Sequence, residues 1–183
     1  MRIISGIKKS IIIKAPKNLP VSVRPTTDKV KESLFNIILN KFNFNEIRVL
    51  DLFSGTGNVS YEFASRGCPN LLSIDNNHKC IKFINKTASE LELNINTKKI
   101  DYKVFLKKNK KKFDIIFADP PYDFTIRQYL EISELIKENE ILSDIGELII
   151  EHSSIINLTD NFKNIDERKY GSSVLSFIKK ASL

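Results

Sequence analysis

Residues 119–122 read Asp-Pro-Pro-Tyr and follow a strongly apolar run. Prolines cannot donate to a strand ladder, so the strand ends there in a stiff loop whose carbonyl groups stay unpaired. Such a loop can hold the amino group of a substrate, whose N–H groups would donate hydrogen bonds to the Asp119 carboxylate and the Pro120 carbonyl. Tyr122 adds an aromatic face on which a flat ring can stack. The candidate catalytic residues are Asp119, Pro120, Pro121 and Tyr122.

A second motif, residues 51–57, carries an expected strand through a glycine turn into a helix. Gly55 and Gly57 let backbone amides approach a ligand that a Cβ atom would hold away. A dinucleotide site needs a third glycine where Ser60 stands, which disfavours a nicotinamide oxidoreductase. Asp51 would repel a pyrophosphate but could accept hydrogen bonds from the ammonium group of an amino-acid ligand.

Acidic side chains stand at or just past the ends of four expected strands, at Asp51, Asp75, Asp101 and Asp119. Parallel strands joined by right-handed crossovers place their carboxyl ends at one edge of a sheet, where open α/β folds bind ligands. Each residue alone could be an ordinary turn aspartate. Together they predict one crevice, in which Asp75 could accept hydrogen bonds from ribose hydroxyls.

The elements that must position these residues alternate between short apolar runs and amphipathic segments, which indicates a parallel α/β sheet. Thr27 or Asp28 can cap an earlier helix. Two short stretches around Gly6 suggest an N-terminal strand pair, and two around Gly171 predict a final hairpin. We expect strands near 48–53, 71–75, 97–100, 114–118 and 147–151, and helices near 59–65, 79–91 and 125–137.

The chain has 183 residues, of which 42% are hydrophobic, and this size fits one globular domain. Its formal charge of +7 permits a polyanionic partner. The alternative is that the excess of lysine reflects a biased composition, which would place lysines on any exposed face without a partner. Residues 1–31 are rich in Lys and Arg and residues 131–151 are rich in Asp and Glu, which predicts separate basic and acidic surfaces. The lysine tract at 107–112 predicts an exposed loop. Two cysteines support no zinc site or disulfide framework. Without a signal-peptide core or membrane-length apolar run, we expect a cytoplasmic protein.

Three motifs in order, residues 24–26 (Arg-Pro-Thr), 51–57 and 119–122, together with the opening residues 1–6 and Ser-Arg-Gly at 65–67, carry a family resemblance. The chain resembles the bacterial RsmD family, class I S-adenosylmethionine-dependent methyltransferases that modify guanine N2 of 16S ribosomal RNA. The resemblance implies a Rossmann-like, seven-stranded, mostly parallel sheet with a reversed last strand, plus an N-terminal β-hairpin and helix. It implies one domain, with an RNA-facing extension over 1–26 and the helix and catalytic core over 27–183.

The resemblance also implies roles for individual residues. Asp119 and Tyr122 would hold the guanine, and Asp101 would bind the adenine amine of S-adenosylmethionine. At position 75 such enzymes commonly carry a longer Glu, so the ribose contact that the resemblance implies would here be made by the shorter side chain of Asp75. Cofactor-binding residues would be Asp51, Phe53, Gly55, Gly57, Asp75, Asn76, Asp101 and Tyr102, and RNA-binding residues Arg2, Lys8, Lys9, Arg24, Pro25 and Thr26.

The implied partner is small-subunit ribosomal RNA or a 30S assembly particle, bound by a monomer without a metal or a membrane. A DNA methyltransferase acting on adenine N6 or cytosine N4 is the nearest alternative, because the Asp-Pro-Pro-Tyr motif serves those amines too. The small size, with no separate DNA-reading domain, disfavours it. A non-catalytic RNA-binding or ribosome-assembly factor is a further alternative, against which the intact motifs argue.

Overall fold

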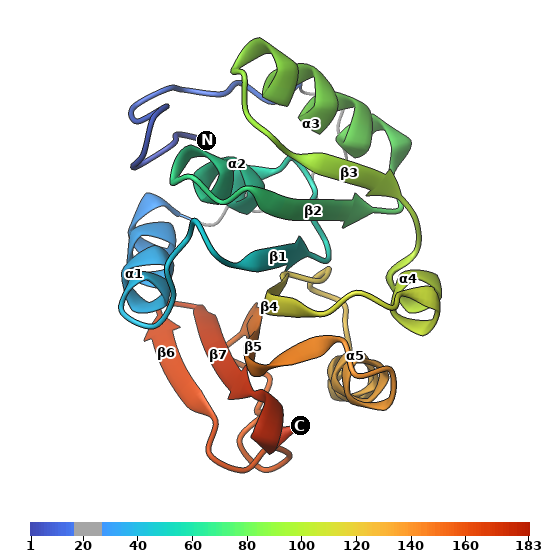
Figure 1. Cartoon of the computed structure of the whole chain (residues 1–183). Coiled ribbons are helices and arrows are strands. Elements are labelled where there is room, and N and C mark those ends of the chain that lie inside the picture. The colour runs from blue at the N-terminus through green and yellow to red at the C-terminus, as the bar shows by residue number, and fades with distance from the viewer. Residues whose placement is uncertain (17–26) are drawn as a thin grey trace.

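The computed structural model describes residues 1–16 and 27–183, and its centre is a seven-stranded sheet with the order β3-β2-β1-β4-β5-β7-β6 (Figure 1). Strand β7 runs antiparallel to β5 and β6, and the remaining neighbours are parallel. The mostly parallel sheet with a reversed last strand is therefore confirmed. The strands are β1 (Arg48–Asp51), β2 (Asn70–Asp75), β3 (Asn96–Lys99), β4 (Phe113–Ala118), β5 (Leu142–Ser153), β6 (Asp166–Tyr170) and β7 (Ser173–Lys179).

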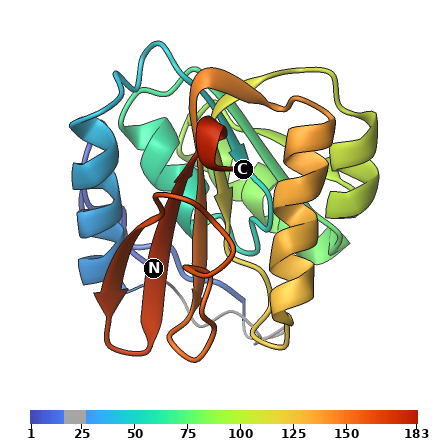
Figure 2. The same ribbon diagram turned by 90° about the horizontal axis from the view of Figure 1, so that it is seen from below.

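Helices cover both faces of the sheet, and Figure 2 shows α1 and α5 on opposite sides of it. Neighbouring strand residues such as Ile115 and Ile116 belong to different apolar clusters, one under α1 to α3 and the other under α4 and α5. The central strands are thus buried on both faces, as parallel strands between helical layers must be. The helices are α1 (Asp28–Leu39), α2 (Asn58–Ser65), α3 (His78–Glu90), α4 (Tyr102–Lys108) and α5 (Ile126–Glu138), followed by the short 3₁₀ turn η1 (Lys180–Ser182).

Helix α4 was not expected from the sequence, and it changes the interpretation of the lysine tract. Lys107 and Lys108 form the last turn of α4, so only the remainder of residues 107–112 is a loop. The Asp101 side chain begins the helix by accepting hydrogen bonds from the backbone N–H groups of Lys103 and Val104, at 2.9 and 3.3 Å. An aspartate cap followed by apolar residues at helical spacing was the available signal.

The expected N-terminal strand pair is present but short: Arg2 and Ile12 form an antiparallel bridge, and backbone hydrogen bonds join Ile3 to Ile11 at 3.0 Å and Ile13 to Met1 at 2.9 Å. Between its two arms the segment bonds to α2 instead: the N–H of Ile4 donates to a side chain of α2, and the N–H of Ile7 donates to the carbonyl of Ser65. Gly6 also adopts a positive φ of 82°. The predicted N-terminal β-hairpin is therefore confirmed in a short form, and the loop between its two arms packs on α2.

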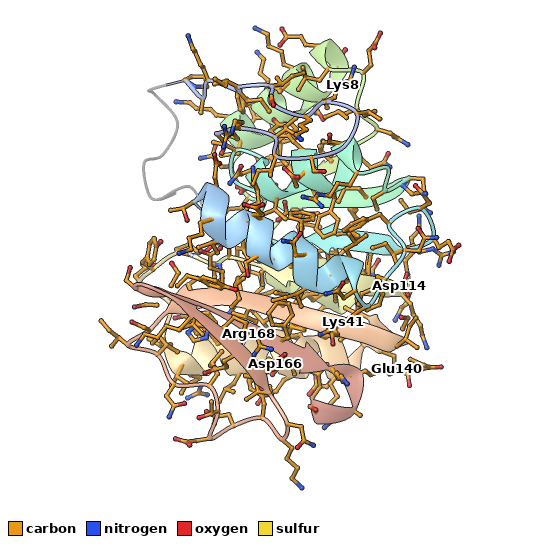
Figure 3. The ribbon with its side chains drawn as sticks, turned by 90° about the vertical axis from the view of Figure 1, so that its left-hand side faces the viewer. Lys8, Lys41, Asp114, Glu140, Asp166 and Arg168 are labelled. Carbon is orange, nitrogen blue, oxygen red and sulfur yellow. The ribbon has the colours of Figure 1, made fainter. Side chains whose placement is uncertain are left out.

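The acidic residues of 131–151 do not form one surface. Glu147 and Glu151 are buried, and the Glu147 carboxylate pairs at 2.9 Å with Lys41, which follows α1 (Figure 3). Asp144 pairs with Lys180 at 2.6 Å. Over residues 1–16 and 27–183, no helix combines the length and the apolar character that crossing a membrane requires.

Candidate active site

A cavity of about 380 Å³ opens at the carboxyl edge of the sheet, where the loops after β1, β2, β3 and β4 meet. This volume is within the range of roughly 300–1,000 Å³ that small-molecule sites occupy. The converging loops follow from the parallel strands, whose carboxyl ends share one edge. Residues that line it include Phe53, Gly55, Asp75, Asp101, Asp119 and Tyr122.

The loop after β4 brings the four candidate catalytic residues together. Asp119, Pro120, Pro121 and Tyr122 all line the cavity, and the Tyr122 side chain is 54% exposed. Burial raises the pKa of Asp119 well above its ordinary value, and the nearby carboxylates of Glu151 and Asp51 raise it further. An acid in this position keeps a proton more readily than a surface aspartate does.

The glycine turn after β1 is tied to the end of β2. Gly55 has a positive φ of 50°, and its N–H donates a 2.8 Å hydrogen bond to the Asp75 carboxylate. The second carboxylate oxygen accepts from the N–H of Asn77 at 2.7 Å. Asn76, between these two residues, also lines the cavity. Asp75 therefore fixes the shape of both loops while it faces the cavity.

Aromatic rings form one wall of the cavity. Tyr102 packs against Phe53 with ring centroids 5.0 Å apart, and Phe124 contacts both rings at 5.9 and 5.6 Å. The Tyr102 hydroxyl is buried and makes no hydrogen bond to the described part of the chain. A buried donor of this kind is costly unless a ligand or water satisfies it. Asp101 lies beside this wall, exposed at the start of α4.

Two predicted cofactor-binding residues, Asp51 and Gly57, do not line the cavity. Asp51 is 2% exposed and accepts a short hydrogen bond from the hydroxyl of Ser60. Burial is the main reason that the pKa of Asp51 rises to about 7. A Cβ atom at Gly57 would lie 2.9 Å from the Ile84 side chain and 3.0 Å from the Tyr61 ring. Packing thus explains the glycine at position 57, and a direct ligand contact of Asp51 or Gly57 stays a prediction.

The predicted RNA-binding residues that the structure describes lie on the N-terminal segment. Arg2 forms a 2.9 Å ion pair with Asp28, and both side chains are about half exposed. Lys8 lies 3.5 Å from Glu92, and Lys9 is exposed. Figure 3 shows Lys8 at the opposite end of this face from β6. Arg24, Pro25 and Thr26 lie outside the described residues.

Sequence reasoning missed several residues of the cavity, of which Phe124 and Gln128 are the clearest. Gln128 and Thr125 form a capping box: the Gln128 side chain accepts from the N–H of Thr125 at 2.9 Å. The spacing of a threonine and a glutamine three residues later was the available signal. It places the start of α5 directly after the stiff proline loop, so the helix helps to hold that loop.

The strand order, the reversed β7 and the cavity beside a glycine turn define a Rossmann-like class I methyltransferase fold. The solved structure of "Putative methyltransferase yhhF" from Escherichia coli superposes with a TM-score of 0.79, at 25% identity over 97% of this chain and 96% of that chain.

The family model described as "Conserved hypothetical protein 95" matches residues 1–179. The chain belongs to this family, the RsmD family that the sequence motifs resemble. Bacillus subtilis "Putative rRNA methyltransferase YlbH" is 34% identical over 98% of this chain and 99% of its own length. "Ribosomal RNA small subunit methyltransferase D" of Buchnera aphidicola subsp. Baizongia pistaciae is 37% identical over 76% of this chain and 69% of its own.

Proposed function

We propose that this protein is a methyltransferase that moves a methyl group from S-adenosylmethionine to the exocyclic N2 amine of a guanine in 16S ribosomal RNA. The observation that carries the proposal is that the loop of Asp119 and Tyr122 lines the same cavity as the glycine turn at Gly55. The names of the relatives, an rRNA methyltransferase and a ribosomal RNA small subunit methyltransferase, support RNA as the substrate.

The residues of the cavity fit S-adenosylmethionine. Gly55 allows the ligand to come close to the backbone, and the aromatic wall suits an adenine ring. Carboxylates at Asp75 and Asp101 suit the ribose hydroxyls and the adenine amine, and the buried Tyr102 hydroxyl still lacks a hydrogen-bond partner in the described chain. When bound, the cofactor supplies an electrophilic methyl group on its sulfonium.

The chain's own residues would orient the nucleophile. The guanine amine is weakly nucleophilic because its lone pair is delocalised into the ring. Hydrogen bonds from its N–H groups to the Asp119 carboxylate and the Pro120 carbonyl would aim the nitrogen and favour its attacking form. Tyr122, half exposed at the mouth of the cavity, offers a face on which the base stacks.

Methyl transfer leaves the amine cationic, and one proton must then depart. That cation is acidic, so a strong base is unnecessary. The raised pKa of Asp119 makes its carboxylate a suitable first acceptor of the proton. Asp119 must lose its proton before it can accept hydrogen bonds from the guanine amine. Because its pKa is raised, we expect activity to rise with pH.

The test is to incubate the protein with methyl-labelled S-adenosylmethionine and one of three substrates: small subunits from cells that lack the protein, naked 16S rRNA, or genomic DNA. We expect label in ribosomal RNA, and at least a hundredfold less with Asp119→Ala, whose affinity for S-adenosylhomocysteine should stay within about twofold. Label in DNA alone would contradict the proposal, and so would equal activity of the variant and the parent.

A further inference from the structure

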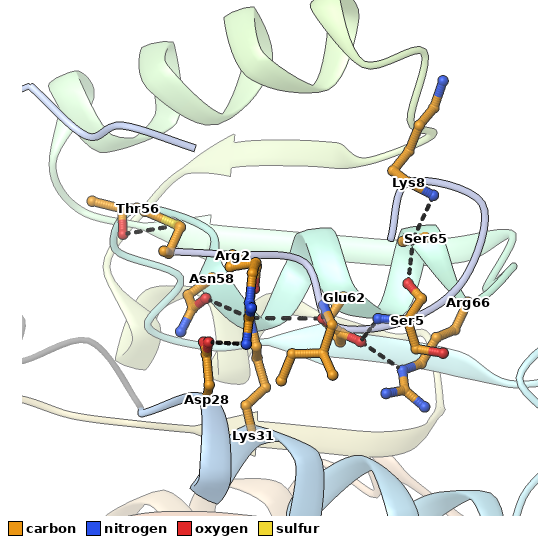
Figure 4. Close-up of polar contacts among 12 residues, drawn as sticks. Arg2, Ser5, Lys8, Asp28, Lys31, Thr56, Asn58, Glu62, Ser65 and Arg66 are labelled. Carbon is orange, nitrogen blue, oxygen red and sulfur yellow. Dashed lines mark hydrogen bonds and ion pairs between the residues drawn. The ribbon is translucent and has the colours of Figure 1, made fainter. Parts of the chain in front are cut away.

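Glu62 on α2 is a carboxylate that is 0% exposed. It accepts hydrogen bonds from the backbone N–H groups of Ile4 and Ser5 at 2.8 and 3.0 Å, and from Nε of Arg66 at 2.8 Å (Figure 4). A buried charge is tolerated only where such donors surround it. Two of these donors belong to the N-terminal segment, residues 1–8, so this segment is fastened to α2 through one side chain.

Ser65, one turn later on α2, holds the same segment at a second point. Its hydroxyl donates to the carbonyl of Ser5 at 2.6 Å and accepts from the N–H of Lys8 at 3.0 Å. Its carbonyl accepts from the N–H of Ile7 at 2.8 Å. A Cβ atom at Gly6 would lie only 1.8 Å from that carbonyl oxygen, so the two backbones are in direct contact. The segment therefore has one defined position on the helix.

Lys31 links this attachment to α1 and to the start of α2. Its side chain is 1% exposed, and its ammonium lies 3.6 Å from the Glu62 carboxylate and donates to the side chain of Asn58 at 2.9 Å and to the carbonyl of Arg2. Asn58 directly follows the glycine turn. Figure 4 shows the side chains of Lys31 and Glu62 converging between α1 and α2.

The segment also reaches the glycine turn itself, because the hydroxyl of Thr56 lies 3.9 Å from the sulfur of Met1. Thr56 stands between Gly55, which lines the cavity, and Gly57, from which α2 begins. The glycine turn, through which Gly55 lines the cavity, and residues 1–8 thus both contact α2 or the turn that leads into it. A change in how the segment sits on α2 would alter the position of Arg2 and Lys8 relative to the cavity.

We propose that Glu62 is a positioning residue, which holds residues 1–8 in register with the methyl-donor cavity and so determines how tightly RNA is bound beside it. This inference rests on the proposed function. Arg2, Lys8 and Lys9 supply cations for phosphates, and a backbone that is already fixed binds a polyanion more tightly because less conformational entropy is lost on binding. Glu62 contacts neither the cavity nor the exposed surface, so it acts through the segment.

The first test is Glu62→Gln, which keeps the size of the side chain and removes its charge. We expect the KM for 16S rRNA to rise at least tenfold, while kcat and the affinity for S-adenosylhomocysteine change less than twofold. Ser65→Ala removes two of the segment's hydrogen bonds and none of the buried charge. It should raise the KM about threefold, and it carries the test if Glu62→Gln does not fold.

Glu147→Gln is the matched control. Glu147 is also a buried carboxylate, 3% exposed, but it lies on β5. Both its oxygens accept from Nζ of Lys41 at 2.9 Å, whereas Glu62 accepts from the backbone of residues 1–8. We expect its KM for RNA to match that of the parent. Amide hydrogen exchange supplies a second measurement: Ile4, Ser5 and Ile7 should exchange faster in Glu62→Gln, with the amides of β1 and β4 unchanged.

The outcomes separate this inference from the proposed function. A parent protein that transfers no methyl group to RNA would remove the proposed function, and this inference with it. A parent that methylates RNA, with an unchanged KM in both Glu62→Gln and Ser65→Ala, would overturn the positioning role alone. An equal rise in KM for Glu147→Gln would also overturn it, because general loss of stability would then explain the effect.

Discussion

The N–H of Gly55 donates to the Asp75 carboxylate across the two loops that follow β1 and β2, at 2.8 Å. The same carboxylate lines the cavity. Its second oxygen accepts from the N–H of Asn77, the residue that caps α3. One side chain therefore fixes the glycine turn, the end of β2 and the start of a helix, while it stays available to a ligand.

Asp75→Ala should weaken binding of S-adenosylhomocysteine at least tenfold and lower the free energy of unfolding by about 1–3 kcal/mol, since hydrogen bonds to a charged group are lost. Calorimetric titration and urea denaturation measure the two effects. Asp114→Ala is the control: its carboxylate accepts from the N–H of Arg48 at 2.8 Å and from Ser143 at 2.6 Å, where β1 and β4 begin. If both variants kept the parent's affinity, the ligand role of Asp75 would be rejected.

Gly57→Ala should destabilise the fold by about 1–3 kcal/mol. The residue has a φ of 83°, and a Cβ atom would meet the Tyr61 ring and the Ile84 side chain at 3.0 and 2.9 Å. Urea denaturation should show a lower midpoint with an unchanged slope. Gly171→Ala is the comparison, because Gly171 also has a positive φ, of 60°, but no atom lies within 4 Å of the position that a Cβ would take. Equal losses in both variants would show that packing around Gly57 contributes nothing.

Asp51→Asn should change how stability depends on pH. Burial raises the pKa of Asp51 from 3.8 to about 7, so the unfolded chain releases this proton near pH 4 while the folded chain keeps it until near pH 7. The folded state binds the proton more tightly, and its stability from this group falls as pH rises through that interval. The variant lacks this loss, so between pH 4 and 8 its free energy of unfolding should increase by up to about 4 kcal/mol relative to that of the parent. Parallel stability curves from urea denaturation would contradict the raised pKa.

Tyr122→Ala should raise the KM for RNA roughly 5-fold to 150-fold, because base stacking on an aromatic ring contributes about 1–3 kcal/mol. Tyr122→Phe retains the ring and should behave like the parent. Steady-state kinetics with 16S rRNA compares the three proteins. Since Tyr122 is 54% exposed, neither change should move the thermal midpoint much. A KM as high for Phe as for Ala would show that the hydroxyl, and not the ring, holds the substrate.

The sheet could be predicted because its strands carry a simple signal. Runs such as residues 115–118 are apolar on both faces, and the residues that end them are acidic. These features are local, and the right-handed crossover rule then gives one shared edge. The final hairpin around Gly171 was predicted and is confirmed by β6 and β7.

The attachment of the N-terminal segment to α2 could not be predicted because it depends on contacts distant in sequence. Ile4 and Ser5 bond to Glu62, nearly sixty residues away, and no local pattern marks a buried glutamate as their acceptor. Asp51 illustrates the same limit. The sequence places it at the end of β1, but its burial under the hydroxyl of Ser60 depends on how α2 packs.

The most direct test of the account is the identity of the modified nucleoside. The protein is incubated with S-adenosylmethionine and small subunits from cells that lack it, and the 16S rRNA is then digested to nucleosides and analysed by mass spectrometry. We predict a gain of N2-methylguanosine, absent when Asp119→Ala replaces the parent protein. A gain of a methylated adenosine or cytidine instead, or no new methylated nucleoside at all, would contradict the account.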